Sequence, residues 1–212
     1  MNKQQQRMSK IIAMLKKEYP DSRCSLEYES PFQLLVSTIL SAQCTDERVN
    51  KVAKKLFAKY PKAESIASLP LETIKNAIYS TGFYNNKAKS IKGMAIAVVE
   101  KHNCELPANL EELIKLPGVG RKTANVVLGN IYDTPSLVVD THVTRISNLL
   151  GFVQTKDAVK IEMELMKIVE EDDWTIFSHL LIDHGRAVCI ANRPNCKECI
   201  ISDNCPSSKI LN

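Results

Sequence analysis

The hydrophobic residues of this 212-residue chain recur with a helical period along most of its length. Apolar residues three and four apart form the stripe that buries one face of an amphipathic helix. Strand-like alternation is nowhere sustained beyond the short apolar run at 137–139. The pattern therefore predicts an all-α fold. Helix-breaking residues divide the middle of the chain into helices of ordinary length, at Pro61, Pro70, Gly82, Pro107, Gly118 and Pro135.

One of these breaks is a glycine turn directly before a clear apolar stripe. Gly118 and Gly120 flank Val119, and the stripe that follows consists of Ala124, Val127, Leu128 and Ile131. Glycine tolerates positive φ and close backbone approach, so the amides of Gly118, Val119 and Gly120 can point outward together at a helix N-terminus. Backbone amides presented in this way suit a phosphate group.

Lys122 lies on the first turn of the same predicted helix, roughly opposite its apolar stripe. An amine beside a phosphate-binding turn is a candidate nucleophile for DNA chemistry. The alternative is a hairpin between two core helices that carries a solvated lysine.

Asp140 closes the apolar run at 137–139 and precedes a second stripe formed by Val143, Ile146 and Leu150. An aspartate at this position is typical of a helix N-cap, where its carboxylate accepts hydrogen bonds from free amides. A catalytic role requires that it act together with Lys122.

The turn at Gly118 has an echo earlier in the chain. Leu69-Pro70 precedes Gly82 and Lys87-Ala88 much as Leu106-Pro107 precedes Gly118 and the helix with Lys122. Both stretches predict a helix, a glycine turn and a second helix. The echo is either a true duplication or the ordinary pattern of helical hairpins, and in both cases it suggests two turns that face one substrate.

Four cysteines near the C-terminus are separated by six, two and five residues, namely Cys189, Cys196, Cys199 and Cys205. Without a secretory signal, such a cluster indicates metal ligation rather than disulfides. Four thiolates suit tetrahedral zinc or an iron–sulfur cluster. Only one short pair is present, which favours iron–sulfur weakly and leaves zinc open.

Composition adds little to this picture. Hydrophobic residues make up 44% of the chain, enough for a substantial core, and the net charge of +4 agrees with a polyanionic partner without requiring one. The N-terminal segment lacks a hydrophobic stretch of signal-peptide length, and no later segment approaches a membrane span. We expect a cytoplasmic protein without a membrane partner.

Several motifs together carry a family resemblance. They are LPGVGRKTA at 116–124, VDTHV at 139–143, LSAQCTD at 40–46, STGFYNNKA at 80–88, and the cysteine spacing after HGR at 184–186. In content and order the chain resembles, nearly end to end, the endonuclease III family of helix-hairpin-helix DNA glycosylases and abasic-site lyases. The resemblance implies a [4Fe-4S] cluster on the cysteine quartet and identifies damaged double-stranded DNA as the partner of a monomer.

The resemblance also implies a division into two helical domains. A six-helix domain would cover 21–133, with the helix-hairpin-helix motif at about 107–128, and residues 1–20 would join 134–212 around the cluster. DNA would lie across the cleft between the two domains, with Lys122 and Asp140 on its opposite lips.

The expected chemistry follows from base excision. Attack by neutral Lys122 on C1′ releases the base and leaves an imine, which permits β-elimination, while Asp140 stabilises the charge that develops on the sugar. The target base must leave the duplex. By resemblance Gln43 and Phe83 enter the gap, although the family often has leucine at the second position. Arg193, the only cation between the first two cysteines, is a candidate phosphate contact.

Two other interpretations remain open. A related mismatch adenine glycosylase lacks the hairpin lysine and has a glutamate in the region that reads LSAQ here. A non-catalytic DNA-binding or electron-carrying iron–sulfur protein would need neither Lys122 nor Asp140. The expected substrates of the leading interpretation are oxidised or ring-saturated pyrimidines, a class that comes from the resemblance alone.

Overall fold

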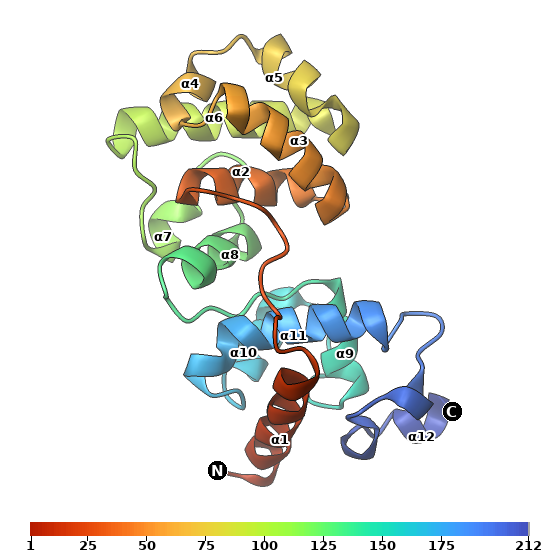
Figure 1. Ribbon diagram of the computed structural model, residues 1–212. Helices are drawn as coiled ribbons and strands as arrows, with labels where there is room; N and C mark the ends of the chain where they lie inside the picture. Colours follow the sequence, from red (N-terminus) through yellow and green to blue (C-terminus); the bar gives the residue numbers. More distant parts are fainter. Residues whose placement is uncertain (212) are drawn as a thin grey trace. The chain divides into compact units, whose positions relative to one another are not determined.

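The computed structural model describes residues 1–211 and consists of helices joined by turns (Figure 1). Those residues contain no β-strand, so the all-α prediction is confirmed. The apolar run at 137–139 is buried but has no regular secondary structure. None of the helices in the described chain combines the length and apolar character needed to cross a membrane.

The chain divides into two compact units, Cys24–Thr134 and Met1–Arg23 together with the chain from Pro135 onward. The first unit contains α2 (Pro31–Ser41), α3 (Asp46–Lys59), α4 (Ala63–Ala67), α5 (Leu71–Ile78), the 3-10 helix η1 (Tyr79–Thr81), α6 (Tyr84–Lys101), α7 (Leu110–Leu113) and α8 (Arg121–Ile131).

Helix α2 is the centre of the first unit. Every residue from Phe32 to Leu40 is buried, and the helix packs against α3, α6 and α8. Ser30 caps its N-terminus and Pro31 occupies its first turn, where a proline costs no hydrogen bond. Because α6 and α8 both pack on α2, the glycine turns that precede these two helices are held by one core.

The second unit contains α1 (Lys3–Glu18), α9 (Thr141–Leu149), α10 (Ala158–Leu165), η2 (Glu171–Asp173), α11 (Trp174–Ala187), η3 (Cys196–Glu198), η4 (Ser202–Asn204) and α12 (Ser208–Leu211). Helix α11 packs against both α1 and α9. The buried stripe of α1 consists of Met8, Ile11, Ile12 and Leu15. The N-terminal helix therefore completes the core of a unit that otherwise comes from the C-terminal third of the chain.

Arg7 ties α1 to the end of the chain. Its guanidinium group donates to the carbonyl oxygen of Asn204 at 3.0 Å and lies 4.0 Å from the centre of the Phe152 ring. A cation over an aromatic face is attracted by the ring, and the contact also covers the apolar stem of the arginine. Because Asn204 precedes Cys205, α1 helps to fix the last of the four clustered cysteines.

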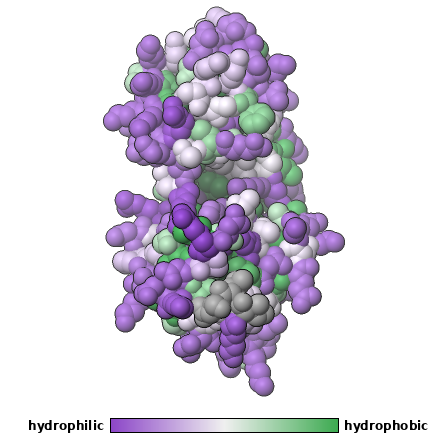
Figure 2. All heavy atoms as spheres, turned by 90° about the vertical axis from the view of Figure 1, so that its right-hand side faces the viewer, coloured by the Kyte–Doolittle hydropathy of each residue, from purple (hydrophilic) through white to green (hydrophobic). Residues whose placement is uncertain are grey.

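Hydrophilic side chains cover most of the surface seen in Figure 2, and the hydrophobic residues on that face form small separate patches. The large apolar side chains gather in two buried cores, one in each unit. Phe83 is an exception, because 63% of it is exposed. An exposed aromatic side chain that is not part of a core is a candidate contact for a partner.

Candidate functional site

The glycine turn between α7 and α8 is tightly packed. Gly118 has a φ of +75°, and a Cβ placed there would lie 2.3 Å from the Cβ of Ser90 on α6. The Val119 amide donates to the Leu116 carbonyl oxygen at 3.1 Å, and the Val119 side chain is buried. The expectation that three amides of this turn face outward is therefore wrong for Val119, because the turn itself uses that N–H.

The N-terminus of α8 remains without a side-chain cap. Gly120 is the N-cap residue, and within the described chain neither Gly118 nor Gly120 donates its amide to another group. The first amides of a helix are not satisfied by the helix itself and carry its positive partial charge. Lys122, on this first turn, is exposed as predicted. The site can therefore receive an anion and presents an amine beside it.

Gln43 and Phe83 share an unusual backbone conformation. Their φ angles are +53° and +48°, in the left-handed region that residues other than glycine rarely adopt. Gln43 lies in the turn after α2 and Phe83 is the N-cap residue of α6, and both side chains are exposed. Gln43 is therefore not part of a helix face, and Phe83 does not belong to the core.

One hollow in the first unit brings these features together. Gln43, Phe83 and Gly118 all line it, together with Ala42, Ser90 and Thr123. The two glycine turns of the sequence echo thus border the same hollow, and the turn after α2 supplies a third wall. Such left-handed residues are costly and are found preferentially at functional sites.

Lys87 lies beneath this hollow, with only 5% of the residue exposed. Its ammonium group donates to the carbonyl oxygens of Leu40 and Thr81, each at 2.8 Å. Burial lowers the pKa of Lys87, while the nearby Cys44 opposes that shift. Lys87 was not predicted from the sequence as a site residue. Its position in the helical repeat could have indicated a special role. Lys87 falls on the apolar stripe of α6 with Ile91 and Met94, where a charged residue is unusual.

Asp140, in the second unit, is the N-cap residue of α9, as its position in the sequence predicts. Its carboxylate accepts a hydrogen bond from the Val143 amide at 2.8 Å. The preceding run is anchored by the hydroxyl of Ser178 on α11, which accepts from the Val138 amide at 2.9 Å. The carboxylate is therefore held by its own helix, and the backbone that leads to it is fixed to the core.

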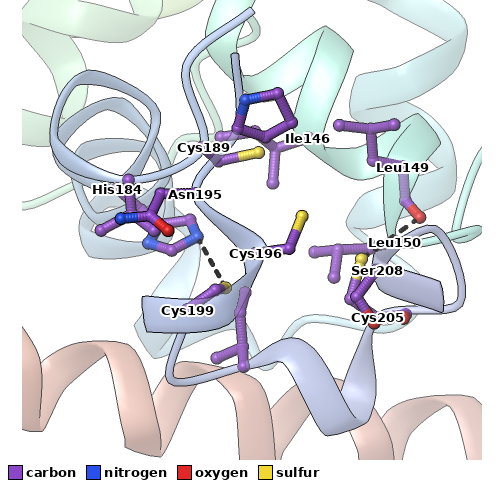
Figure 3. Close-up of a pocket in the computed structure, with 13 residues that line it drawn as sticks. Ile146, Leu149, Leu150, His184, Cys189, Asn195, Cys196, Cys199, Cys205 and Ser208 are labelled. Carbon is purple, nitrogen blue, oxygen red and sulfur yellow. Dashed lines mark hydrogen bonds between the residues drawn. The ribbon is translucent and has the colours of Figure 1, made fainter. Parts of the chain in front are cut away.

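The four clustered cysteines line one small cavity in the second unit (Figure 3). Apolar side chains of α9, Ile146 and Leu149, also line the cavity, as does Leu150 at the C-cap of that helix. Burial raises the pKa of Cys199 to about 11, and the other three cysteines raise it further by repulsion between thiolates. Burial also raises the pKa of Cys189, so these two thiols favour their neutral form unless a cation is present to stabilise the thiolates.

Polar groups from neighbouring helices reach these sulfur atoms. The guanidinium group of Arg145 donates to Cys189 Sγ at 3.4 Å. His184, only 1% exposed, places Nε2 at 3.6 Å from Cys199 Sγ, and its Nδ1 lies 3.1 Å from the Tyr19 hydroxyl. Burial, together with the charge of Arg145, lowers the pKa of His184 to about 4. His184 is thus a buried residue that links Tyr19 to the cysteine segment, and the contacts of Arg145 and Tyr19 were not predicted from the sequence.

No group of three or more potential ligands in the described residues is arranged to hold a single metal ion. A four-iron cluster is larger than one ion and binds one thiolate at each iron, so its ligands surround a wider space. Between the first two cysteines, Arg193 is exposed on the loop surface.

Comparison with known proteins identifies the family. The model of the HhH-GPD superfamily base excision DNA repair proteins matches residues 36–171, which include the glycine turn, Lys122 and Asp140. Endonuclease III of Synechocystis is 50% identical over 210 residues, which cover 99% of this chain and 96% of the relative. This chain belongs to the endonuclease III family. Both the helix-hairpin-helix resemblance and the fold class predicted from the sequence are thereby confirmed.

Two solved structures extend the likeness to the whole fold. A non-covalent endonuclease III–DNA complex and a trapped endonuclease III–DNA covalent intermediate each match with a TM-score of 0.93 and 42% sequence identity. Each match covers 99% of this chain, and 98% and 99% of the two solved chains respectively. The family fold is therefore present from end to end.

Proposed function

We propose that this protein is a DNA glycosylase and abasic-site lyase that releases oxidised or ring-saturated pyrimidines from duplex DNA and then cuts the strand. The observation that carries the proposal is the exposed Lys122 on the uncapped first turn of α8, directly behind the glycine turn. Relatives solved with DNA, one of them as a trapped covalent intermediate, support the same reaction class.

The glycine turn supplies the contact to the DNA backbone. A phosphate at the N-terminus of α8 would accept from the amides of Gly118 and Gly120 and would interact favourably with the helix dipole. Such contacts fix the register of the protein on DNA but carry no sequence information. They would hold one nucleotide beside Lys122. On the other unit, Arg193 would add a second phosphate contact.

Lys122 supplies the nucleophile. Its neutral amine attacks C1′, the N-glycosidic bond breaks, and the damaged base leaves with the bonding electrons and takes up a proton. The nitrogen lone pair then expels O4′, which takes up the proton that the nitrogen releases, so the sugar ring opens and an imine forms. This imine acidifies C2′, so loss of a proton there expels the 3′-phosphate by β-elimination. Water then hydrolyses the imine and returns the free amine. One side chain therefore serves both base release and strand cleavage.

Asp140 supplies the negative charge that this reaction needs. Positive charge develops on the sugar as the base departs, and a fixed carboxylate stabilises it more in the transition state than in the ground state. The hydrogen bond from the Val143 amide holds the carboxylate in one orientation. In this proposal the N-cap role and the catalytic role belong to the same group, because the cap fixes the charge.

Gln43 and Phe83 fill the gap left by the extruded nucleotide. Extrusion costs a few kcal/mol of stacking and pairing, and an inserted side chain recovers part of that cost. The two residues come from separate turns, are exposed and line the same hollow. Phe83 offers a flat face that stacks on a neighbouring base, and the amide of Gln43 offers hydrogen bonds to an unpaired one.

The cysteine quartet would hold a [4Fe-4S] cluster through Cys189, Cys196, Cys199 and Cys205. The crowding of the four half-buried thiols and the apolar side chains that line their cavity support this assignment. When bound, such a cluster cross-links four points of the C-terminal segment, and its binding is coupled to the folding of that segment. We assign it no part in base release.

Borohydride trapping tests the proposal. The substrate is a duplex with one thymine glycol, and the proteins are the native chain, Lys122→Ala and the control Lys101→Ala. Lys101 is an exposed lysine at the opposite end of α6 from the hollow. The native protein and Lys101→Ala should form a covalent adduct on reduction, and Lys122→Ala should form none.

Two results would contradict the proposal. Base release by the native protein without an adduct would remove Lys122 from the reaction and indicate a monofunctional glycosylase, the class of the mismatch adenine enzymes. Binding without base release or adduct would indicate a DNA-binding iron–sulfur protein that does not act on this lesion.

A further inference from the structure

Lys87 connects the two turns that carry Gln43 and Phe83. Leu40, the acceptor of one hydrogen bond, lies three residues before Gln43, and Thr81, the other acceptor, lies two residues before Phe83. One ammonium group thus bridges the end of α2 and the end of η1 from a position on α6.

The Leu40 carbonyl is one that its own helix cannot satisfy. It lies in the last turn of α2, where the backbone leaves helical geometry at Ala42. A cation at a helix C-terminus interacts favourably with the dipole as well as with the carbonyl oxygen. The bond from Lys87 therefore fixes the point at which the chain departs toward Gln43.

The lysine is costly at this position. Taking an ammonium group out of water is unfavourable, and an apolar side chain of similar length would fill the same space on the stripe of α6 without that cost. The two carbonyl contacts recover part of it. What an apolar residue cannot supply is a fixed separation between the two turns.

We propose that Lys87 is a positioning residue that sets the spacing of Gln43 and Phe83, so that both side chains enter the DNA together. This inference rests on the roles given to those two residues in the proposed function. Lys87 acts through the backbone of both turns and does not contact the DNA. Its removal should therefore impair extrusion of the base while the phosphate contacts of the α8 turn remain.

The test replaces Lys87 with methionine, which keeps the length and loses the donors. Lys92→Met is the matched control, because Lys92 lies on the same helix and donates to one carbonyl, that of Leu69, at 2.7 Å. Excision of thymine glycol from duplex DNA is measured with saturating enzyme in a single turnover. Lys87→Met should be slower by about 10- to 100-fold, the scale of a misplaced catalytic geometry, and Lys92→Met should keep the native rate.

Two further readouts separate positioning from a general loss of stability. Affinity for undamaged duplex should be native in Lys87→Met, because the α8 turn is intact. A 2-aminopurine placed opposite the lesion should brighten less on binding, since unstacking of that base requires the inserted side chains. Lys87→Arg keeps both charge and donors and should restore most of the excision rate.

A double-mutant cycle decides the case. In a Gln43→Ala/Phe83→Ala background, Lys87→Met should cause little additional loss of excision, because nothing remains to be positioned. An equal loss in both backgrounds would overturn the inference. If Lys87→Met is insoluble, the same cycle with Lys87→Gln, which keeps a donor without the charge, applies the same criterion.

Failure of the proposed function can be distinguished from failure of the Lys87 inference. If Gln43→Ala and Phe83→Ala both excise at the native rate, the gap-filling role is wrong and the role of Lys87 falls with it. If these two variants excise slowly, but Lys87→Met causes the same loss in their combined background as in the native protein, only the Lys87 inference is wrong. Borohydride trapping at Lys122 is independent of both results.

Discussion

Gly118 packs directly against Ser90, so that a Cβ at position 118 would lie 2.3 Å from the serine Cβ and 2.6 Å from its Oγ. The φ of +75° adds a second constraint. Gly118→Ala should therefore destabilise the protein by more than the 1–2 kcal/mol, roughly, that a left-handed alanine costs by itself. Urea denaturation followed by far-UV circular dichroism measures the loss.

Two variants separate the causes. Gly120→Ala meets no atom within 4 Å and has a φ of −94°, so it should cost far less. Gly118→Ala should cost less in a Ser90→Gly background than in the native one, because the clash is then removed and only the backbone strain remains. Equal losses in the two backgrounds would show that the contact with Ser90 is unimportant.

Asp140 has a structural role and a proposed catalytic one, which two substitutions distinguish. Asparagine caps helices about as well as aspartate, whereas alanine costs about 1 kcal/mol. Asp140→Asn should therefore unfold like the native protein, and Asp140→Ala should be less stable. Excision should fall in both, by roughly 100-fold or more if the charge stabilises the transition state. Native excision by Asp140→Asn would leave the residue with the cap alone.

The cysteine quartet should be needed for iron binding and for local folding. Cys196→Ser should lower the iron content and the visible absorbance of the purified protein, because one ligand of the proposed cluster is lost. Hydrogen exchange should then increase in residues 188–208. Cys104→Ser is the control, since Cys104 is exposed in the other unit and should leave iron content and exchange unchanged. Full iron content in Cys196→Ser would exclude that residue as a ligand.

The helical fold could be predicted from the sequence because its signals are local. The stripe behind Gly118 depends on residues within one helix, and Asp140 caps the helix that follows it directly. Such relationships are fixed by spacing along the chain. The grouping of the cysteines was equally visible, because their sulfur atoms come from one short segment.

The features that could not be predicted from the sequence depend on contacts between distant segments. Lys87 reaches a carbonyl 47 residues away, and Arg145 reaches the sulfur of Cys189 across 44 residues. The use of the Val119 amide within its own turn was local, but it depends on the exact turn geometry, which two glycines leave open. Contacts across tertiary structure and fine backbone geometry are thus what the structure adds.

We expect His179 on α11 to make the free energy of unfolding sensitive to acid. Burial lowers its pKa below the ordinary value of 6.5, while Asp183 opposes the shift. Because the folded pKa is depressed, the unfolded state binds the proton more readily as the pH falls through 6.5. The contribution of neutral His179 to the free energy of unfolding is therefore complete above that pH and is lost progressively below it.

The single tryptophan, Trp174, lies on the same helix and reports the unfolding of this unit. Urea unfolding monitored by its fluorescence should show a smaller loss between about pH 7.5 and pH 5.5 for His179→Gln than for the native protein. His102→Gln should leave that profile unchanged, because His102 belongs to the other unit. A His179→Gln profile as steep as the native one would mean that other groups carry the acid sensitivity of this unit.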